Sequence, residues 1–336
     1  MAISSGSTIN GQARDETFTY DNEGRLVTAA GYSTWQRRYV YDRYGNRTGS
    51  WDSTSGGNQL QNITLGTTGG ATNNRIATVN GVSYSCDSAG DVTSDGLHTY
   101  QYDCEGRIAN VDPGTSGEAD YYYDVDDWRV KKVTGAGGSS PITTYYVWDA
   151  GQVIAEYSTS APTGNGVRYY HPDRLSNRMI TDTNGNAIGT EDVLPFGEDA
   201  GTGSGVTEKY RFTNYERDSE SATDYALNRQ YSSAGGKFLR PDPVRGSITS
   251  PQSLNAYAYS MNDPLNRFDP LGLDTCNYLL VQQPAARFER RHTPQRHRNH
   301  RLFSGRGRSC GSRSRPSCGR RQRWQMSTYS LALHSP

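Results

Sequence analysis

The chain has 336 residues, of which only 50 are Leu, Ile, Val or Phe, and its 35 basic residues balance its 35 acidic ones. So low an aliphatic content makes disorder the default expectation only when net charge is also high, and here the net charge is zero. The 24 Tyr and 37 Gly favour many short strands and turns over long helices. No stretch is apolar enough for a membrane span, and residues 1–10 lack the basic start and apolar run of a signal peptide.

Charge is distributed very unevenly along the chain. Up to Leu273 there are 22 basic and 33 acidic residues, together with 22 of the 24 Tyr. The 63 residues after Leu273 contain 13 basic and 2 acidic residues, no Lys and four of the six His. The sequence therefore consists of two segments of different chemistry. Five scattered cysteines do not indicate a disulfide framework.

One phrase recurs in the first segment, and it predicts a repeat architecture. The copies are FTYDNEGRL (18–26), YVYDRYGNR (39–47), YSCDSAGDV (84–92), YQYDCEGRI (100–108) and a degenerate YYYDVDDWRV (121–130). In the first copy, Phe18 and Tyr20 alternate with Thr19, as in a strand with both rings on one face. Asp21 is expected to cap a turn, and Gly24 to adopt the left-handed conformation that the chain reversal needs. Each repeat is thus predicted to be one β-hairpin, and stacked hairpins to bury a ladder of Tyr rings.

These phrases resemble the YD-repeat, or Rhs, family, which is related to teneurins and to the C subunits of insecticidal toxin complexes. The resemblance implies an all-β fold, an antiparallel β-hairpin ribbon that in the family spirals into a hollow shell around a C-terminal cargo. It weakens between Gly49 and Asn80, where the sequence indicates only a loop rich in Gly, Thr and Asn. Family shells are several times longer, so this chain is expected to be a C-terminal fragment or a decayed copy, too short to enclose a cargo.

The segment before Leu273 is similar to the Rhs-associated core, whose closing mark D-P-x-G-L is present as residues 269–273. The resemblance implies three domains: a YD-repeat ribbon (1–168), the core (169–273) and a variable tail (274–336). It also implies that the core is an intramolecular aspartic protease. On the family's motif, the catalytic carboxylates are Asp242 and Asp269, the supporting arginine is Arg229, and the scissile bond joins Leu273 to Asp274. In this chain, Arg-Gln-Tyr-Ser (229–232) stands where the family has Arg-Tyr-Tyr-Asp.

The residue types suit that chemistry. Two carboxylates held close together cannot both ionise, so one keeps a proton and polarises the carbonyl while the other takes a proton from water. An adjacent arginine holds one carboxylate charged or stabilises the oxyanion. The alternative interpretation is structural, because Asp-Pro pairs at Asp112, Asp242, Asp263 and Asp269 are also ordinary turn starters.

Three interpretations of the tail compete. In the first it is a nucleic-acid-directed toxin, in which Arg neutralises phosphate and His292, His297 and His300 act as a base or metal ligands. In the second these His form a zinc site with Cys310 and Cys318, although the spacing fits poorly. The third, which we favour, is an out-of-frame or disordered segment that lacks the apolar content to fold and binds nucleic acid only through charge.

The sequence therefore predicts the C-terminal part of an Rhs polymorphic toxin or cell-surface protein that cuts itself once, after Leu273, to release the tail. The alternative is a non-enzymatic adhesive ribbon that binds carbohydrate or a surface partner. Toxin-delivery or cell-surface components are the expected partners, and the expected location is secreted or at the cell surface. No cofactor and no metal are expected.

Overall fold

The computed structural model describes residues 16–31, 35–54, 57–149, 152–160, 167–176, 178–201, 203–206, 208–244, 246–273 and 275. It also describes the backbone of strand residues 2–3, 8–9, 12–13 and 276–277. Within these residues every strand pairing is antiparallel, and the only helices are three short 3-10 turns. The predicted all-β class is confirmed.

The N-terminal strands form an eight-stranded sheet in the order β1-β4-β5-β6-β7-β8-β9-β10. Its strands are β1 (Ala2–Ile3), β4 (Glu16–Tyr20), β5 (Leu26–Gly31), β6 (Trp35–Tyr41), β7 (Arg47–Asp52), β8 (Asn58–Thr68), β9 (Ala71–Val79) and β10 (Val82–Ser83). Two further pairs are β2 (Thr8–Ile9) with β3 (Gln12–Ala13), and β11 (Ser85–Cys86) with β12 (Val92–Ser94).

The next sheet has six strands that follow chain order, as a succession of hairpins requires. They are β13 (Tyr100–Tyr102), β14 (Ile108–Val111), β15 (Ala119–Tyr123), β16 (Arg129–Thr134), β17 (Ile142–Asp149) and β18 (Gln152–Ser158). A four-stranded sheet follows, formed by β19 (Tyr169–His171), β20 (Met179–Thr181), β21 (Ala187–Thr190) and β22 (Ser204–Gly205).

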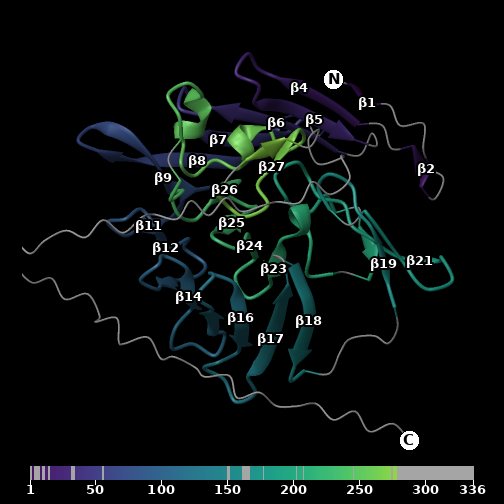
Figure 1. Cartoon of the computed structure of the whole chain (residues 1–336). Helices are drawn as coiled ribbons and strands as arrows, with labels where there is room; N and C mark the ends of the chain where they lie inside the picture. Colours follow the sequence, from purple (N-terminus) through teal and green to yellow (C-terminus); the bar gives the residue numbers. More distant parts are fainter. Residues whose placement is uncertain are drawn as a thin grey trace, which may run out of the picture. The chain divides into compact units, whose positions relative to one another are not determined.

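The last four-stranded sheet carries much of the candidate site, with strands β23 (Glu216–Asp218), β24 (Thr223–Tyr225), β25 (Gln230–Ser232) and β26 (Lys237–Phe238). The pair β27 (Arg267–Phe268) and β28 (Cys276–Asn277) closes the described chain. The 3-10 helices are η1 (Phe212–Asn214), η2 (Pro251–Leu254) and η3 (Ser260–Asn262). Figure 1 shows the green strands β23 to β26 between the purple and blue eight-stranded sheet and the teal six-stranded sheet.

The repeat turns have the predicted geometry. Oδ1 of Asp21 accepts hydrogen bonds from the backbone N–H groups of Glu23 and Arg25, at 3.1 and 2.9 Å, and Gly24 has a φ of 77°. Asp103 repeats this arrangement with Glu105 and Arg107, at 3.0 and 2.9 Å. The sequence-based prediction of one hairpin per repeat, closed by its Asp, is therefore confirmed at these turns.

Each repeat is also fastened to the next by side chains that the phrase repeats. Nη1 of Arg25 donates to the carbonyl of Asp42 at 2.9 Å, and Nη1 of Arg107 donates to the carbonyl of Asp124 at 3.4 Å. In the opposite direction, the hydroxyl of Tyr41 donates to the Leu26 carbonyl at 2.7 Å. The Tyr rings thus contribute hydrogen bonds between repeats as well as buried area.

The expectation of a loop between Gly49 and Asn80 was wrong. This region forms β8 and β9, two long strands joined through Gly69 and Gly70, whose φ values of 60° and 82° suit a tight hairpin turn. Ile63 and Ile76 are the only buried residues of these two strands, so apolar residues do not mark the strands, and the Thr-rich sequence with a Gly-Gly turn was the only local signal. Likewise, Cys104 is disulfide-bonded, which the scattered spacing of the cysteines did not indicate.

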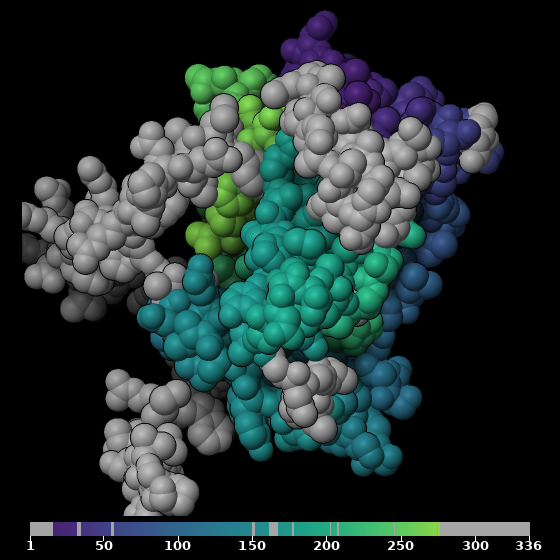
Figure 2. All heavy atoms as spheres, turned by 90° about the vertical axis from the view of Figure 1, so that its right-hand side faces the viewer, coloured from purple at the N-terminus to yellow at the C-terminus, as the bar shows by residue number. Residues whose placement is uncertain are grey.

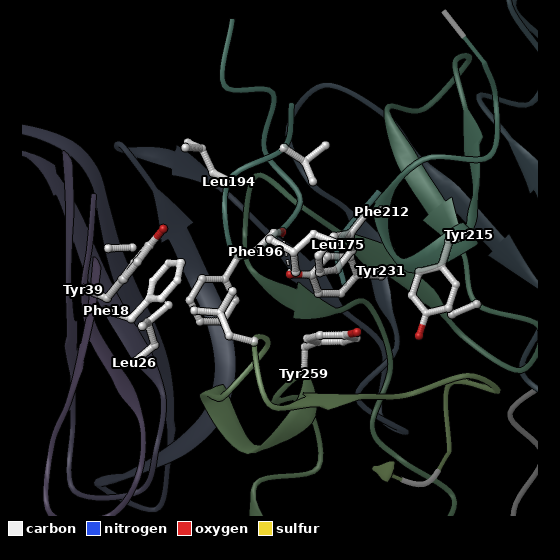
Figure 3. Packing of buried hydrophobic residues seen from close by; sticks show 14 of the residues in the cluster. Phe18, Leu26, Tyr39, Leu175, Leu194, Phe196, Phe212, Tyr215, Tyr231 and Tyr259 are labelled. Carbon is white, nitrogen blue, oxygen red and sulfur yellow. Dashed lines mark hydrogen bonds between the residues drawn. The ribbon is translucent and has the colours of Figure 1, made fainter. Parts of the chain in front are cut away.

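The main core joins the first hairpins to the segment before Leu273. Figure 3 shows Phe18, Leu26 and Tyr39 on the N-terminal side facing Phe196, with Phe212, Tyr231 and Tyr259 beyond it. The rings of Tyr39 and Phe196 meet edge to face at 4.9 Å. A second cluster, around Tyr100 and Tyr121, includes Leu239 from the C-terminal part. On the face in Figure 2, teal and green residues from the middle of the chain lie between the blue N-terminal strands and the yellow-green residues near Leu273.

A buried charge cluster joins the six-stranded sheet to β23. The Arg129 guanidinium of β16 lies 2.8 Å from Glu216 and 2.7 Å from Asp218, and all three side chains are buried. Lys132 contacts the same two carboxylates at 3.2 and 3.0 Å. Because these charges are paired and hydrogen-bonded on several sides, the cluster fixes the position of β16 against β23.

Candidate active site

The three residues that the sequence singled out lie together. Nη2 of Arg229 is 2.7 Å from Oδ2 of Asp242 and 3.0 Å from Oδ2 of Asp269. The two carboxylate oxygens are therefore closer to each other than the sum of those distances. Two acids 27 residues apart in the sequence thus meet on one guanidinium nitrogen.

Arg229 is fixed from several directions. It directly precedes β25, its side chain is 2% exposed, and its guanidinium lies 3.6 Å from the centroid of the Phe238 ring. Nη1 donates to the carbonyl of Ala256 at 3.1 Å. Burial lowers the pKa of Arg229, whereas the charges of Asp242 and Asp269 act to raise it. The two carboxylates therefore help to keep the buried guanidinium charged.

The two carboxylates have different surroundings. Asp242 lies in a turn in which its Oδ1 accepts the N–H of Val244 at 2.8 Å, and its side chain is 15% exposed. Asp269 is only 2% exposed. Burial raises the pKa of Asp269 to about 6, against the opposing effects of Arg229 and of the Leu273 N–H. Two acids in unlike environments, one of them with its pKa raised to about 6, are suited to opposite roles in proton transfer.

The backbone of the D-P-x-G-L segment is held next to these acids. Oδ1 of Asp269 accepts the backbone N–H of Leu273 at 2.9 Å, and Nε of Arg229 donates to the carbonyl of Gly272. Gly272 has a φ of 66°, and a Cβ at this position would lie 2.5 Å from the carbonyl oxygen of Ala226. Glycine is thus required here for both its conformation and its small size.

Leu273 and both acids border one open cavity of about 320 Å³. Its other lining residues include Val244, Ser247, Gln252, Ser253, Asn255, Met261 and Thr275. The cavity gives water a path to the carboxylates and to the backbone of Leu273. A nucleophilic water, two carboxylates and a peptide group are the components of acid–base peptide hydrolysis.

The segment that follows Leu273 turns back on the strand that leads into Asp269. β28 pairs antiparallel with β27, with Phe268 opposite Cys276 and Arg267 opposite Asn277. Leu273 therefore lies between two strands that pair with each other. Asp274 itself, and the tail residues His292, His297, His300, Cys310 and Cys318, lie outside the described residues.

Sequence reasoning missed two contributors to the site. The Tyr215 hydroxyl donates to the carbonyl of Asp269, and Asn228 hydrogen-bonds to the carbonyl of Leu271. Asn228 directly precedes Arg229, and this adjacency was the available signal for it. Nothing local marked Tyr215, which is 54 residues from Asp269 in the sequence.

The remaining Asp-Pro pairs have the ordinary structural role. Asp112 binds the Thr99 N–H at 2.8 Å and Nδ1 of His98 at 2.6 Å, and Asp263 binds Nδ2 of Asn266 at 2.9 Å. Among the residues that the structure describes, no group of three or more His, Cys, Asp or Glu is arranged to hold a metal ion. The helices of this part of the chain include none long and apolar enough to cross a membrane.

Comparison with known proteins agrees with the repeats. The family model described as the teneurin YD-shell matches residues 2–140. The tRNA3(Ser)-specific nuclease WapA of Bacillus spizizenii is 28% identical over 262 residues, which cover 70% of this chain and 11% of that protein. The tRNA nuclease WapA of Bacillus subtilis is 27% identical over 255 residues, with the same coverage. Residues 2–140 thus resemble the YD-shell, and the wider match is to WapA proteins, which supports an Rhs/YD-repeat type of chain.

Solved structures share the fold of this chain. A crystal structure of TcdB2-TccC3 with Cdc42 superposes with a TM-score of 0.61 and 22% identity, and the match covers 78% of this chain and 16% of that one. The chain thus spans about a tenth of the length of the WapA proteins and about a sixth of the chain in the TccC3 structure.

Proposed function

We propose that this Rhs chain is part of a polymorphic toxin whose core, residues 169–273, is an intramolecular aspartic endopeptidase. It cuts the bond between Leu273 and Asp274 and so separates the YD-repeat ribbon (1–168) and core from the tail (274–336). The observation that carries the proposal is that Asp242 and Asp269 share one nitrogen of Arg229 at the cavity that Leu273 borders.

The proposed reaction follows from the two environments. Asp242, the more exposed acid, takes a proton from a water molecule in the cavity, and the water oxygen bonds to the carbonyl carbon of Leu273. Asp269, whose pKa is about 6, gives its proton to the departing nitrogen of Asp274 as the C–N bond breaks. The products are a carboxylic acid at Leu273 and an amine at Asp274, and the proton taken from water stays on Asp242. Arg229 stabilises the negative charge during these transfers.

One turnover suffices, because the enzyme's own backbone is the substrate. The hydrogen bonds to Gly272 and Leu273 hold the reacting segment in place before the reaction begins. Holding reactants in this way replaces a binding step and contributes a large part of the rate.

The released tail contains 13 basic and 2 acidic residues, and its proposed interaction is charge-driven binding of nucleic acid. The WapA relatives are tRNA nucleases, and the TccC3 structure is a complex with TcdB2. By analogy, the proposed partners are toxin-delivery components and the proposed location is outside the cell or at its surface.

The test is the fate of the full 37.1 kDa chain on a denaturing gel at neutral pH. The proposal expects two fragments, with an N-terminal sequence beginning at Asp274, and no cleavage in Asp269→Asn or Asp242→Asn. Asp112→Asn is the matched control, because it makes the same change in an Asp-Pro pair outside the site and should be cut like wild type. An intact wild-type chain, or a cut at an Asp-Pro bond, would refute the peptidase.

One observation favours the adhesive alternative. On one face of the six-stranded sheet, Tyr122, Lys131, Tyr145 and Tyr157 are cross-strand neighbours, and the three Tyr are exposed. Nζ of Lys131 lies 4.5 Å from the Tyr122 ring centroid, and the Tyr145 and Tyr157 rings are 6.4 Å apart. Such a row of ring faces is suited to stacking on sugars.

The adhesive function predicts an intact chain whose migration is retarded by soluble polysaccharides in affinity electrophoresis. Tyr145→Ala together with Tyr157→Ala should remove the retardation, and Asp269→Asn should leave it unchanged. Equal migration of wild type with and without polysaccharide would exclude the adhesive function.

A further inference from the structure

The hairpin between β24 and β25 ends in a strained tip that faces the D-P-x-G-L segment. Its two strands close through a hydrogen bond from the N–H of Ala226 to the carbonyl of Arg229, at 2.9 Å. Between them, Leu227 has a φ of 62°, a left-handed conformation that is unfavourable for a residue with a side chain. Surrounding contacts must hold such a conformation, and strain of this kind is concentrated at functional sites.

The contacts of this tip fall on the backbone of the residues before the proposed cut. Asn228 binds the carbonyl of Leu271 twice, through Nδ2 at 2.9 Å and through its backbone N–H at 3.2 Å. The next residue, Arg229, binds the next carbonyl, that of Gly272, through Nε. Two successive residues of the tip therefore donate hydrogen bonds to two successive carbonyls of the substrate segment.

These hydrogen bonds are made to backbone carbonyls and do not involve the side chain at position 271. The Leu271 side chain is exposed, so it contributes little to the arrangement. Gly272 is the one position at which the tip is selective, because the Ala226 carbonyl leaves no room for a Cβ there. The tip thus places no demand on the side chain at 271 and requires glycine at 272.

We infer that Asn228 is a positioning residue for the self-cleavage, one that holds the Leu271 carbonyl so that the bond after Leu273 stays beside Asp242 and Asp269. The inference rests on the proposed peptidase function. Asn228 is not a catalytic residue, since its contact is two residues before the bond that breaks. It acts through Leu271, while Arg229 acts both on Gly272 and on the carboxylates.

This role has a kinetic signature. The amide of Asn228 does not ionise between pH 5 and 9, so its loss should slow cleavage by the same factor at every pH. A variant that disturbs the carboxylates should instead shift the pH at which the rate changes. The two effects can be separated by measuring rates over a pH range.

The experiment follows self-cleavage of the full chain after dilution from urea into buffers of pH 5 to 9, by densitometry of the fragments. We expect Asn228→Ala to cleave at least tenfold more slowly, as misplacement of a reacting group by about 1 Å can do. The pH dependence should be that of wild type. Asn228→Gln, which keeps the amide donor, should recover part of the rate. Asn184→Ala, in an exposed turn outside the site, should cleave like wild type.

A second measurement does not depend on cleavage. In the uncleaved Asp242→Asn chain, hydrogen exchange of the Leu273 amide reports its bond to Asp269. Adding Asn228→Ala should speed that exchange at least tenfold, because the segment loses the shorter of its two hydrogen bonds at Leu271, the one from the Asn228 side chain. Unchanged exchange would overturn the inference even if Asn228→Ala refolded poorly in the cleavage assay.

The outcomes distinguish the inference from the proposed function. If wild type is cut and Asp269→Asn is not, but Asn228→Ala is cut at the wild-type rate, only the inference falls. If Asn228→Ala shifts the pH dependence, Asn228 acts on the carboxylates and the positioning role is wrong. If wild type is never cut, both the proposed peptidase function and the inference are wrong.

Discussion

The carboxylate of Asp269 accepts a hydrogen bond from the backbone N–H of Leu273 at 2.9 Å. Leu273 is the residue whose peptide bond to Asp274 would be cleaved. The acid and the N–H of Leu273 therefore belong to one five-residue turn, residues 269–273, which this hydrogen bond closes. Protonation of Asp269 and placement of the substrate are coupled by this bond. The first prediction follows from that coupling.

The rate of self-cleavage should fall at high pH, as Asp269 loses its proton. Because burial raises the pKa of this carboxyl to about 6, its protonated form dominates below that pH and is lost as the pH rises through it. If Asp269 supplies the proton, the rate constant should fall about tenfold per pH unit above that value. Cleavage timed on gels between pH 5 and 9 checks this, and a rate that increases from pH 6 to 8 would contradict the role given to Asp269.

Gly272→Ala should impair cleavage more than stability. The left-handed φ costs roughly 1–2 kcal/mol for an alanine, and the new Cβ would also displace the segment from the Ala226 carbonyl. A shift of about 1 Å can lower the rate as much as 10²-fold. Gly114→Ala is the control, because Gly114 also has a positive φ, 78°, but open space around its Cβ position. It should lose similar stability in urea unfolding and keep the wild-type cleavage rate.

The repeat turns should each contribute measurable stability. Asp103→Ala removes the acceptor for two backbone N–H groups and the ion pair with Arg107, so unfolding in urea should be easier by roughly 1–2 kcal/mol. Asp126→Ala changes an exposed acid in the next turn and should lie within about 0.5 kcal/mol of wild type. Equal effects of the two substitutions would show that the Asp of the phrase has no special role.

The lowered pKa of Lys237 should make the free energy of unfolding increase with pH above about 7. It is buried, its Nζ donates to Oδ1 of Asn46 at 2.7 Å, and burial lowers its pKa to about 7. Between that value and its ordinary pKa of about 10.4, the unfolded chain binds the extra proton, so the Lys237 contribution to stability grows as pH rises. The unfolding free energy of wild type relative to Lys237→Met should therefore increase from pH 7 to 9, by up to about 1.4 kcal/mol per unit. A difference independent of pH would contradict the lowered pKa.

Local patterns predicted the hairpins well, because a turn needs only its own few residues. The Asp and Gly of the first repeat, Asp21 and Gly24, make the contacts that their types imply. The family's motif also placed Arg229 with its two acids, although their roles remain a proposal. In β8 and β9 the same local approach failed, since exposed polar strands lack an apolar pattern.

Contacts between distant segments left no local trace. Arg129 pairs with Glu216 and Asp218 across 87 and 89 residues, and nothing beside Arg129 in the sequence marks it as buried. The Tyr215 hydroxyl reaches Asp269 in the same way, through packing of the whole C-terminal sheet. Such pairs are decided by topology, which a single sequence specifies only through all of its contacts together.

The bonds that fasten one hairpin to the next have a consequence for how such ribbons change in length. Arg25 and Arg107 each attach to a main-chain carbonyl, a group that every successor supplies whatever its side chains. Loss or duplication of one whole unit would therefore leave a carbonyl available to each of these arginines, whereas an insertion of a few residues beside one of these turns would displace it. Genes for these ribbons should grow and shrink in steps of one hairpin.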